Sequence, residues 1–312
     1  IGESLAFIYF NVDYLVNGIA LSNLFEIASP DEIKGQKPDM ILLFGLKETE
    51  GMVSHYYRDE KNDLWVGEVP YTDKTTYFGY MKKMCLTLHN LHQIYNGRLP
   101  IHGSMLKIKF TNGKEKNVVF FGDSGAGKSE SIEALQELAD DKIVSMETIF
   151  DDMGSFTLTD GEPGVYAQGT ETGAFVRLDD LSSAVAFNNM DRGVYLNPER
   201  QNARVIIPAD TYEHVVEHHP VDMWLYANNY SDEVGIHRFD TEEDAKKVFI
   251  AGKRKALGTT DEVGMSSTFF ANPFGPVQEQ EKTKPIIDKV FNKLFNDGVY
   301  VGEIYTHLGN DK

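Results

Sequence analysis

A glycine-rich segment that ends in lysine and serine is the first part of the chain whose residue types could do chemistry. Residues Gly122–Ser129 read GDSGAGKS and satisfy the pattern G-x-x-x-x-G-K-[ST]. The apolar run Val118–Phe121 before it predicts a buried strand, and Glu130–Leu138 after it predicts a helix. This context is the one that a phosphate-binding loop requires, so the segment predicts binding of a nucleoside triphosphate.

Such a loop assigns different roles to its members. Its glycines let backbone N–H groups converge on an anion. Lys128 would bridge the β- and γ-phosphates, and the Ser129 hydroxyl would ligate a divalent metal ion. The predicted nucleotide-binding residues are Gly122, Asp123, Ser124, Gly125, Ala126, Gly127, Lys128 and Ser129. The alternative is a chance match on a glycine-rich surface turn.

Two neighbouring carboxylates and one histidine could bind metal ions. Asp151 and Asp152 directly follow the short run Thr148–Phe150, which ends in two apolar residues. Nucleotide enzymes place a carboxylate at such a position to hold a metal ion against the phosphates, although an ordinary acidic turn explains the pair equally well. His102 is expected just before a strand and could ligate a metal ion, whereas a lone histidine is more often structural.

Basic residues occur in two kinds of context. Lys82 and Lys83 are adjacent in a helical pattern, where two lysines are usually only solvated. Arg177 and Arg204 stand among apolar strand residues, in AFVRL and ARVIIP. Such arginines suit bidentate binding of a phosphate group, and half-buried salt bridges are the alternative.

Hydrophobic patterns predict the elements that position these residues. Tyr80–Tyr95 has one apolar face and predicts a helix, and Met40–Phe44 predicts a buried strand. Met105–Phe110 and Asn117–Phe121 flank Asn112-Gly113, which predicts a hairpin.

Similar reasoning extends to the rest of the chain. Ser29–Glu32 reads as a capped helix start, Phe156–Val221 as a sheet-rich region and Pro285–Phe295 as a helix before a strand at Val299–Tyr305. We therefore expect an α/β protein with a domain boundary near Arg98–Ile101, which gives domains at residues 1–99 and 100–312.

Composition restricts the possible partners. The chain has 48 acidic and 30 basic residues, a net charge of −18, which disfavours nucleic acid and anionic membranes. No apolar run reaches membrane-spanning length. The only cysteine, Cys85, cannot form an internal disulfide and is expected to be a core residue. A reducing, cytoplasmic location is expected, with small molecules as partners.

The order of these motifs resembles that of ATP-dependent phosphoenolpyruvate carboxykinases over nearly the whole chain. The matching segments are SPDEIKGQKPDMILLFGLK (Ser29–Lys47), TYFGYMKK (Thr76–Lys83), PIHGS (Pro100–Ser104), the glycine-rich loop, the Asp151-Asp152 pair, ETGAFVRL (Glu171–Leu178), NARVIIP (Asn202–Pro208) and VFIAGKRKALGTTD with STFFANPFG (Val248–Gly275). The resemblance implies that a mononucleotide-binding P-loop domain, residues 100–312, follows part of an N-terminal substrate domain, residues 1–99.

The resemblance also implies a metal set. Lys83, His102 and Asp152 would hold Mn²⁺, which contacts the γ-phosphate and an enolate oxygen. Ser129 would hold Mg²⁺ on the phosphates of ATP, and Asp151 would support both ions. Nitrogen and oxygen ligands together suit Mn²⁺ better than Mg²⁺.

The remaining implied roles concern phosphoryl transfer and substrate binding. Lys128 would follow the transferred phosphoryl group and Arg204 would stabilise its charge. Arg177, where the family has lysine, would contact the nucleotide, and Tyr77 would lie beside the carboxylate substrate. Lys83 and Asp151 complete the implied catalytic set. The implied reaction converts oxaloacetate and ATP into phosphoenolpyruvate, CO₂ and ADP, a step of gluconeogenesis.

Besides Arg177, the sequence departs from the family pattern at two places. Asp123, Ala126 and Ser129 replace the usual loop residues, and the loop also resembles that of HPr kinase/phosphorylase. The family's Arg-Ser-Pro-Lys motif, which grips the substrate carboxylate, is expected ahead of residue 1. Two alternatives therefore stay open: a P-loop kinase acting on a protein or small-molecule hydroxyl, and a nucleotide-binding relative without catalysis.

Overall fold

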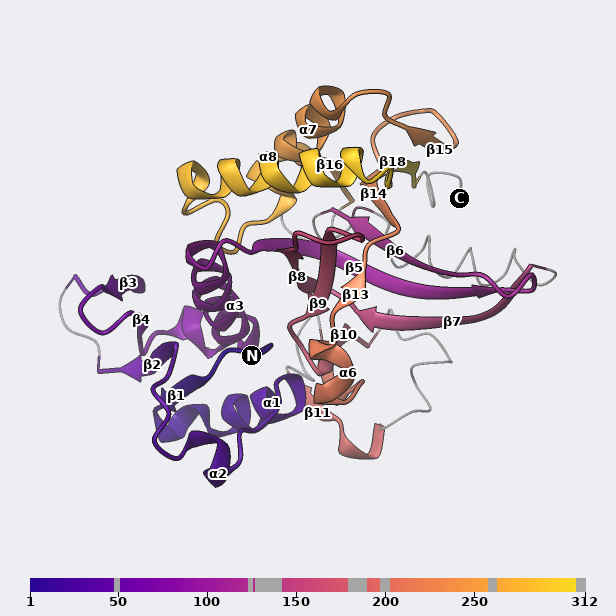
Figure 1. Cartoon of the computed structure of the whole chain (residues 1–312). Helices are drawn as coiled ribbons and strands as arrows, with labels where there is room; N and C mark the ends of the chain where they lie inside the picture. Colours follow the sequence, from indigo (N-terminus) through magenta and orange to yellow (C-terminus); the bar gives the residue numbers. More distant parts are fainter. Residues whose placement is uncertain are drawn as a thin grey trace. The chain divides into compact units, whose positions relative to one another are not determined.

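The computed structural model describes residues 1–47, 51–122, 126, 142–178, 190–196, 203–257 and 263–306 of the chain. These residues form two compact units, one of Ile1–His92 with Thr170–Val216 and one of Gln93–Gly169 with Glu217–Lys312. Figure 1 labels their helices and strands. The sequence alone places residues 170–216 in the second domain, whereas the fold groups them with the first unit.

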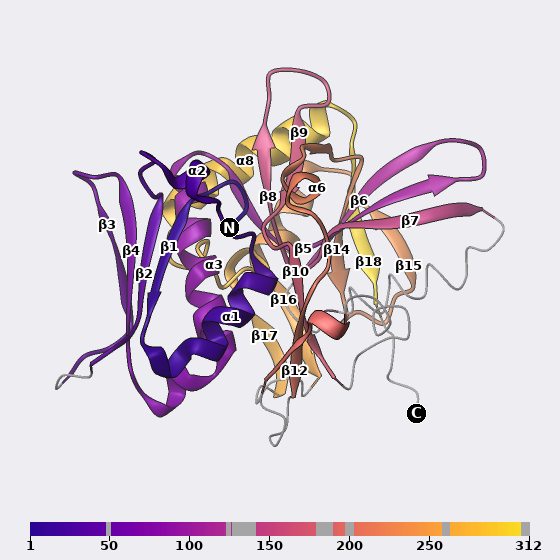
Figure 2. The same cartoon turned by 90° about the horizontal axis from the view of Figure 1, so that it is seen from below.

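The first unit contains a mixed sheet in the order β1-β2-β4-β3, which Figure 2 shows with its strands side by side. Its strands are β1 (Ala6–Phe10), β2 (Met40–Leu46), β3 (His55–Asp59) and β4 (Leu64–Pro70). The first three strands of this order are parallel, and β3 is antiparallel to β4. Helix α3 (Phe78–Tyr95) packs closely on β4, because a Cβ at Gly67 would lie 3.0 Å from Leu88 Cδ1 and 3.4 Å from Met84 Cγ.

A second, antiparallel sheet of the same unit has the order β10-β12-β11. Its strands are β10 (Gly173–Arg177), β11 (Val194–Leu196) and β12 (Arg204–Pro208). Helix α1 (Leu15–Leu24) contacts this sheet so closely that a Cβ at Gly173 would lie 1.9 Å from the main-chain oxygen of Asn23. Arg204 is the first residue of β12, so this sheet positions it.

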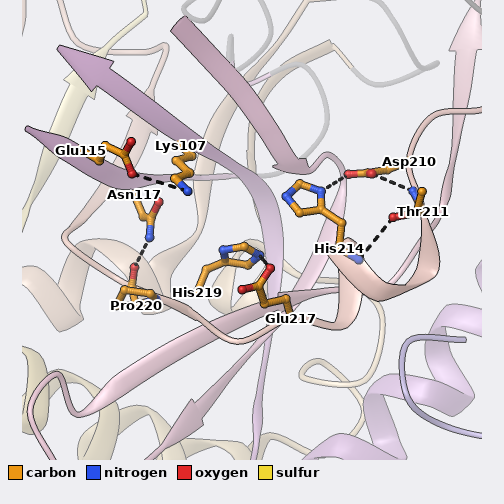
Figure 3. A network of polar contacts seen from close by, with 9 residues as sticks. All are labelled: Lys107, Glu115, Asn117, Asp210, Thr211, His214, Glu217, His219 and Pro220. Carbon is orange, nitrogen blue, oxygen red and sulfur yellow. Dashed lines mark hydrogen bonds and ion pairs between the residues drawn. The ribbon is translucent and has the colours of Figure 1, made fainter. Parts of the chain in front are cut away.

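Short helices complete the first unit. They are η1 (Val12–Tyr14), α2 (Pro30–Ile33), η2 (Asp73–Thr76), η3 (Met190–Arg192) and α6 (Tyr212–Val216). The predicted capped start is confirmed, because Ser29 and Glu32 form a reciprocal capping box at α2. Before α6, Asp210 Oδ2 lies 2.5 Å from His214 Nδ1, and Thr211 Oγ1 accepts a hydrogen bond from the His214 N–H (Figure 3).

The second unit is organised around one large sheet in the order β13-β9-β8-β5-β6-β14-β18-β15, with β7 also paired to β5. Its strands are β5 (Leu99–Phe110), β6 (Glu115–Phe121), β7 (Ile143–Phe150), β8 (Met153–Leu158), β9 (Val165–Gly169), β13 (His219–Pro220), β14 (Met223–Asn228), β15 (Gly235–Arg238) and β18 (Tyr300–Tyr305). Strands β6, β14 and β18 are parallel to one another. Asn117 Nδ2 donates to the Pro220 oxygen at 3.0 Å and so joins β6 to β13 (Figure 3).

Helices α7 (Glu242–Ala251) and α8 (Gln280–Asn296) lie together on one side of this sheet (Figure 1). Between them and the sheet is an aromatic core, in which the Trp224 ring lies 4.5 Å from Phe249 of α7 and 4.9 Å from Phe291 of α8. The remaining elements are the hairpin β16 (Lys253–Leu257) with β17 (Val263–Ser267), and η4 (Phe269–Ala271).

The α/β class is confirmed, as are the predicted helix at α3, the strand at β2 and the hairpin that joins β5 to β6. The prediction that His102 precedes a strand is wrong, because β5 begins at Leu99 to pair with β8. Helix α8 begins at Gln280. The sequence predicted a start at Pro285, because the first turn of the helix is polar and shows no apolar periodicity. The predicted helix Glu130–Leu138 lies outside the described residues. None of the described helices is long and apolar enough to cross a membrane.

Candidate functional site

Three parallel strands of the second unit end at one edge of its sheet. Strand β6 ends directly before Gly122, β14 ends at Asn228 and β18 ends directly before Thr306. Ligands of open α/β sheets bind outside the carboxyl ends of the strands. The first residue of the predicted phosphate-binding loop therefore lies at the edge where a nucleotide is expected.

Two residues of the predicted loop, Gly122 and Ala126, are among those described. The other predicted nucleotide-binding residues, Asp123, Ser124, Gly125, Gly127, Lys128 and Ser129, lie outside the described residues. Ala126 is 1% exposed and a Cβ at Gly122 would lie 3.0 Å from its Cβ atom. The main-chain oxygen of Ala126 accepts a hydrogen bond from Thr306 Oγ1 at 2.6 Å. Both described residues are thus buried against the end of the sheet.

The two predicted carboxylates lie where β7 passes into β8. Both strands pair with β5, β7 with its second half and β8 with its first, and Asp151 and Asp152 occupy the interval. Asp152 has a φ of 84°, a left-handed conformation that turns the chain at this point. The carboxylates face side chains of β5, because Ser104 Oγ donates to Asp151 Oδ1 at 2.5 Å and His102 Nε2 lies 3.2 Å from Asp152 Oδ1.

The orientation of the His102 ring follows from its partners. The imidazole is 1% exposed, and its Nδ1 lies 3.0 Å from the main-chain oxygen of Ala271. A carbonyl oxygen only accepts, so Nδ1 carries a hydrogen, and in a neutral ring the lone pair is then on Nε2. That lone pair faces the Asp152 carboxylate, which is also an acceptor when ionised. A proton on Nε2 makes this contact an ordinary ion pair, and a metal cation between the two atoms could take the place of that proton.

Main-chain hydrogen bonds connect this pair to the loop. The Gly122 N–H donates to the His102 oxygen at 3.0 Å, and the Gly103 N–H donates to the Asp152 oxygen at 3.0 Å. Position 103 requires glycine, since a Cβ there would lie 2.3 Å from the Phe120 oxygen. One short stretch of β5 therefore holds the start of the loop and the two carboxylates in one place.

In the first unit, a buried lysine and an arginine lie over one phenyl ring. Lys82 on α3 is 6% exposed, and its Nζ lies 3.0 Å from Glu171 Oε1 and 5.4 Å from the ring centroid of Phe175. Arg204 Cζ lies 5.2 Å from the same centroid. Both cations are attracted to the ring face. The Nε atom of Arg204 is buried and has no hydrogen-bond partner among the described residues.

The other predicted residues of this unit have different environments. The expectation that both lysines are solvated is confirmed for Lys83, which is exposed, and is wrong for Lys82, which is buried. The two differ because consecutive side chains of a helix point in different directions. The ring of Tyr77 lies 6.4 Å from that of Phe175. Arg177 of β10 lies opposite Arg204 of β12 in this antiparallel pair of strands.

The complete metal set stays a prediction. His102 and Asp152 lie together in the second unit, Lys83 belongs to the first unit, and Ser129 lies outside the described residues. In the part of the chain that the structure describes, no three His, Cys, Asp or Glu side chains form a metal-binding group. The predicted set contains two residues of these kinds, and their imidazole and carboxylate ligands suit Mn²⁺.

Sequence reasoning missed several contacts of these residues. Ser104, Glu171 and Phe175 lie within the motifs PIHGS and ETGAFVRL, so the motifs contained the signal. Ala271 lies within the motif STFFANPFG, although nothing in the sequence pointed to its contact with His102, 169 residues away. Nothing in the sequence pointed to Thr306, whose partner lies 180 residues away. A comparison of the chain with models of known protein families finds no match.

Proposed function

We propose that this protein is an ATP-dependent phosphoenolpyruvate carboxykinase, with that family's P-loop fold in residues 100–312. The observation that carries the proposal is the facing pair of His102 Nε2 and Asp152 Oδ1, 3.2 Å apart, in which His102 lies on the stretch of β5 that also binds Gly122. A metal ligand pair beside the first residue of a phosphate-binding loop supports metal-dependent phosphoryl transfer from ATP.

The reaction divides into two steps. The carbon–carbon bond to the departing carboxylate of oxaloacetate breaks, CO₂ leaves, and the electron pair remains as an enolate. The enolate oxygen then attacks the γ-phosphorus of ATP, the bond to the β–γ bridging oxygen breaks, and ADP leaves. Mn²⁺ and Mg²⁺ would supply positive charge that stabilises the enolate and the transferring phosphoryl group.

The residues of this chain have separate tasks in that scheme. The Ala271 carbonyl orients His102, and Ser104 orients Asp151, so that both side chains keep one direction. Arg204 would donate to oxygens of the phosphoryl group, together with Lys128. Tyr77 would lie beside the substrate carboxylate, and Arg177 would contact the nucleotide.

The test is fixation of CO₂ with phosphoenolpyruvate, ADP and Mn²⁺ by the full-length protein, with malate dehydrogenase and NADH to detect oxaloacetate. We expect activity in the wild type, loss in His102→Gln, and no change in His237→Gln, which alters an exposed histidine of β15. A wild type that fixes no CO₂ but transfers the γ-phosphate of ATP to a hydroxyl acceptor would support a kinase related to HPr kinase/phosphorylase. Binding of ATP without either reaction would support a non-catalytic relative.

The proposal includes location and partners. The single cysteine, Cys85, is buried and fits a reducing compartment, so we expect the cytoplasm. We also expect oxaloacetate, phosphoenolpyruvate and adenine nucleotides as the ligands.

A further inference from the structure

Ala271 and Asn272 are consecutive residues at the end of η4, and both form hydrogen bonds with strand β5. The Ala271 oxygen accepts from Nδ1 of His102 at 3.0 Å, and Nδ2 of Asn272 donates to the Pro100 oxygen at 3.4 Å. Pro100 and His102 are two residues apart, so their Cα atoms lie about 7 Å from each other along the strand. Two points of attachment restrict sliding and rotation of this segment against β5.

The side-chain amide of Asn272 is buried and uses both of its polar ends. The residue is 0% exposed, and its Oδ1 accepts from the Phe274 N–H at 3.0 Å. One end of the amide thus faces an N–H, and the other end faces the carbonyl of Pro100. An N–H only donates and a carbonyl only accepts, so a rotated amide would lose both bonds in a buried place. The amide of Asn272 therefore has one orientation.

The other side of the segment is held by the end of helix α7. The Thr268 N–H donates to the oxygen of Gly252 at 3.1 Å. The contact is close, because a Cβ at Gly252 would lie 1.9 Å from the Thr268 oxygen and 2.4 Å from the Ala271 nitrogen. Residues 268–272 are therefore fixed between α7 and β5.

The direction of the Ala271 carbonyl depends on Asn272 because of peptide geometry. The carbonyl of Ala271 and the N–H of Asn272 belong to one planar peptide group. Any change in the position of Asn272 therefore turns the oxygen that faces His102. A metal-binding histidine almost always donates its second ring N–H to such a partner, which fixes the direction of the nitrogen that binds the metal.

We propose that Asn272 is a positioning residue of the metal site. Its side-chain amide holds the Ala271 carbonyl against Nδ1 of His102 and thereby keeps Nε2 directed toward Asp152. The inference deepens the proposed function and rests on one part of it, that His102 and Asp152 bind Mn²⁺. It concerns a residue that itself contacts neither the ion nor the substrate.

The experiment is titration of the full-length protein with Mn²⁺, in which electron paramagnetic resonance detects the free ion. In Asn272→Ala we expect the affinity for Mn²⁺ to fall about tenfold, as is typical when a partner of a metal ligand is disturbed. Asn272→Ser keeps an acceptor for the Phe274 N–H but is too short to reach the Pro100 oxygen. It should therefore bind Mn²⁺ about as weakly as the alanine variant.

The matched control is Asn117→Ala. Asn117 is 7% exposed, and its Nδ2 also donates to the oxygen of a proline, Pro220, at 3.0 Å (Figure 3). Both alanine variants lose a buried hydrogen bond between two segments, so both should unfold more easily than the wild type. Only Asn272→Ala should bind Mn²⁺ more weakly.

A double-mutant cycle separates positioning from a general loss of structure. If Asn272 acts through the imidazole, Asn272→Ala should have little further effect on Mn²⁺ affinity in a His102→Gln background. The proposal is overturned by a full additional loss in that background, by wild-type affinity in Asn272→Ala or Asn272→Ser, or by an equal loss in Asn117→Ala. A wild type that binds no Mn²⁺ overturns it as well.

The proposed function fails in a different way, namely when the wild type binds Mn²⁺ and fixes no CO₂. That result leaves the effect of Asn272 on Mn²⁺ affinity fully measurable.

Discussion

His102 Nε2 and Asp152 Oδ1 face each other at 3.2 Å, while the other ring nitrogen of His102 lies 3.0 Å from the Ala271 oxygen. Ala271 and Phe270 have φ values of 42° and 53°, so two consecutive residues adopt left-handed conformations although neither is a glycine. Such residues are strained by about 1–3 kcal/mol each and persist where packing enforces them. Phe270, 0% exposed in the aromatic core, supplies that packing. Strain at this place is typical of a functional site.

Replacing His102 with glutamine is expected to weaken Mn²⁺ binding by a factor of about ten or more, because the ring nitrogen that faces Asp152 is lost. A double variant, Lys83→Ala with His102→Ala, should lose Mn²⁺ binding altogether. Electron paramagnetic resonance of free Mn²⁺ measures both affinities, and His237→Gln is the control. Wild-type affinity in the double variant would refute this metal set.

Replacing Glu171 with glutamine is expected to lower the free energy of unfolding by about 3 kcal/mol, because it leaves the buried ammonium of Lys82 without its carboxylate. Urea denaturation measures the change. Asp288→Asn is the matched control, since it breaks an exposed ion pair with Lys246 and should change stability by less than about 1 kcal/mol. A double variant, Lys82→Met with Glu171→Leu, should regain most of the stability. Equal effects of Glu171→Gln and Asp288→Asn would contradict the prediction.

Replacing Gly103 with alanine is expected to lower the free energy of unfolding by about 1–3 kcal/mol, because the added Cβ would lie 2.3 Å from the Phe120 oxygen. The displaced strand should also weaken Mn²⁺ binding, since the Gly103 N–H holds Asp152. Gly161→Ala is the control, as its nearest atom would be Thr159 Oγ1 at 3.9 Å. Wild-type stability and Mn²⁺ affinity in Gly103→Ala would show that β5 tolerates a shift here.

The thiol of Cys85 should make stability fall at high pH. Burial raises the pKa of Cys85 from 9.0 to about 12. Between these values the unfolded chain releases the proton and the folded chain keeps it. The stabilisation is therefore complete below pH 9 and decreases as the pH rises toward 12, by up to about 1.4 kcal/mol per pH unit.

The measurement is the free energy of unfolding of the wild type and Cys85→Ala between pH 8 and about pH 10.5. The alanine variant should show the shallower decrease. Partly buried phenols such as Tyr230, whose pKa is raised to about 12 mainly by desolvation, titrate in both proteins and cancel in the comparison. Identical slopes would show that the thiol does not contribute.

Local signals were enough for the elements that carry the site. The apolar face of Tyr80–Tyr95 predicted α3, and Asn112-Gly113 predicted the hairpin between β5 and β6. These predictions succeed because residue spacing and turn chemistry depend on neighbours in the chain. The same signals failed for the start of β5, which is set by its pairing with β8 about fifty residues later.

Motifs along the chain named Gly122, His102, Asp151 and Asp152 as candidate site residues, since their residue types limit the chemistry available to them. Tertiary structure alone decided how they are used: which nitrogen of His102 faces Asp152, and which residue holds Ala126. Those outcomes depend on Ala271 and Thr306, which reach the site only when distant segments pack together. Hydrogen bonds are short-ranged and directional, so the partner of a buried polar group is chosen by the fold and not by its neighbours in sequence.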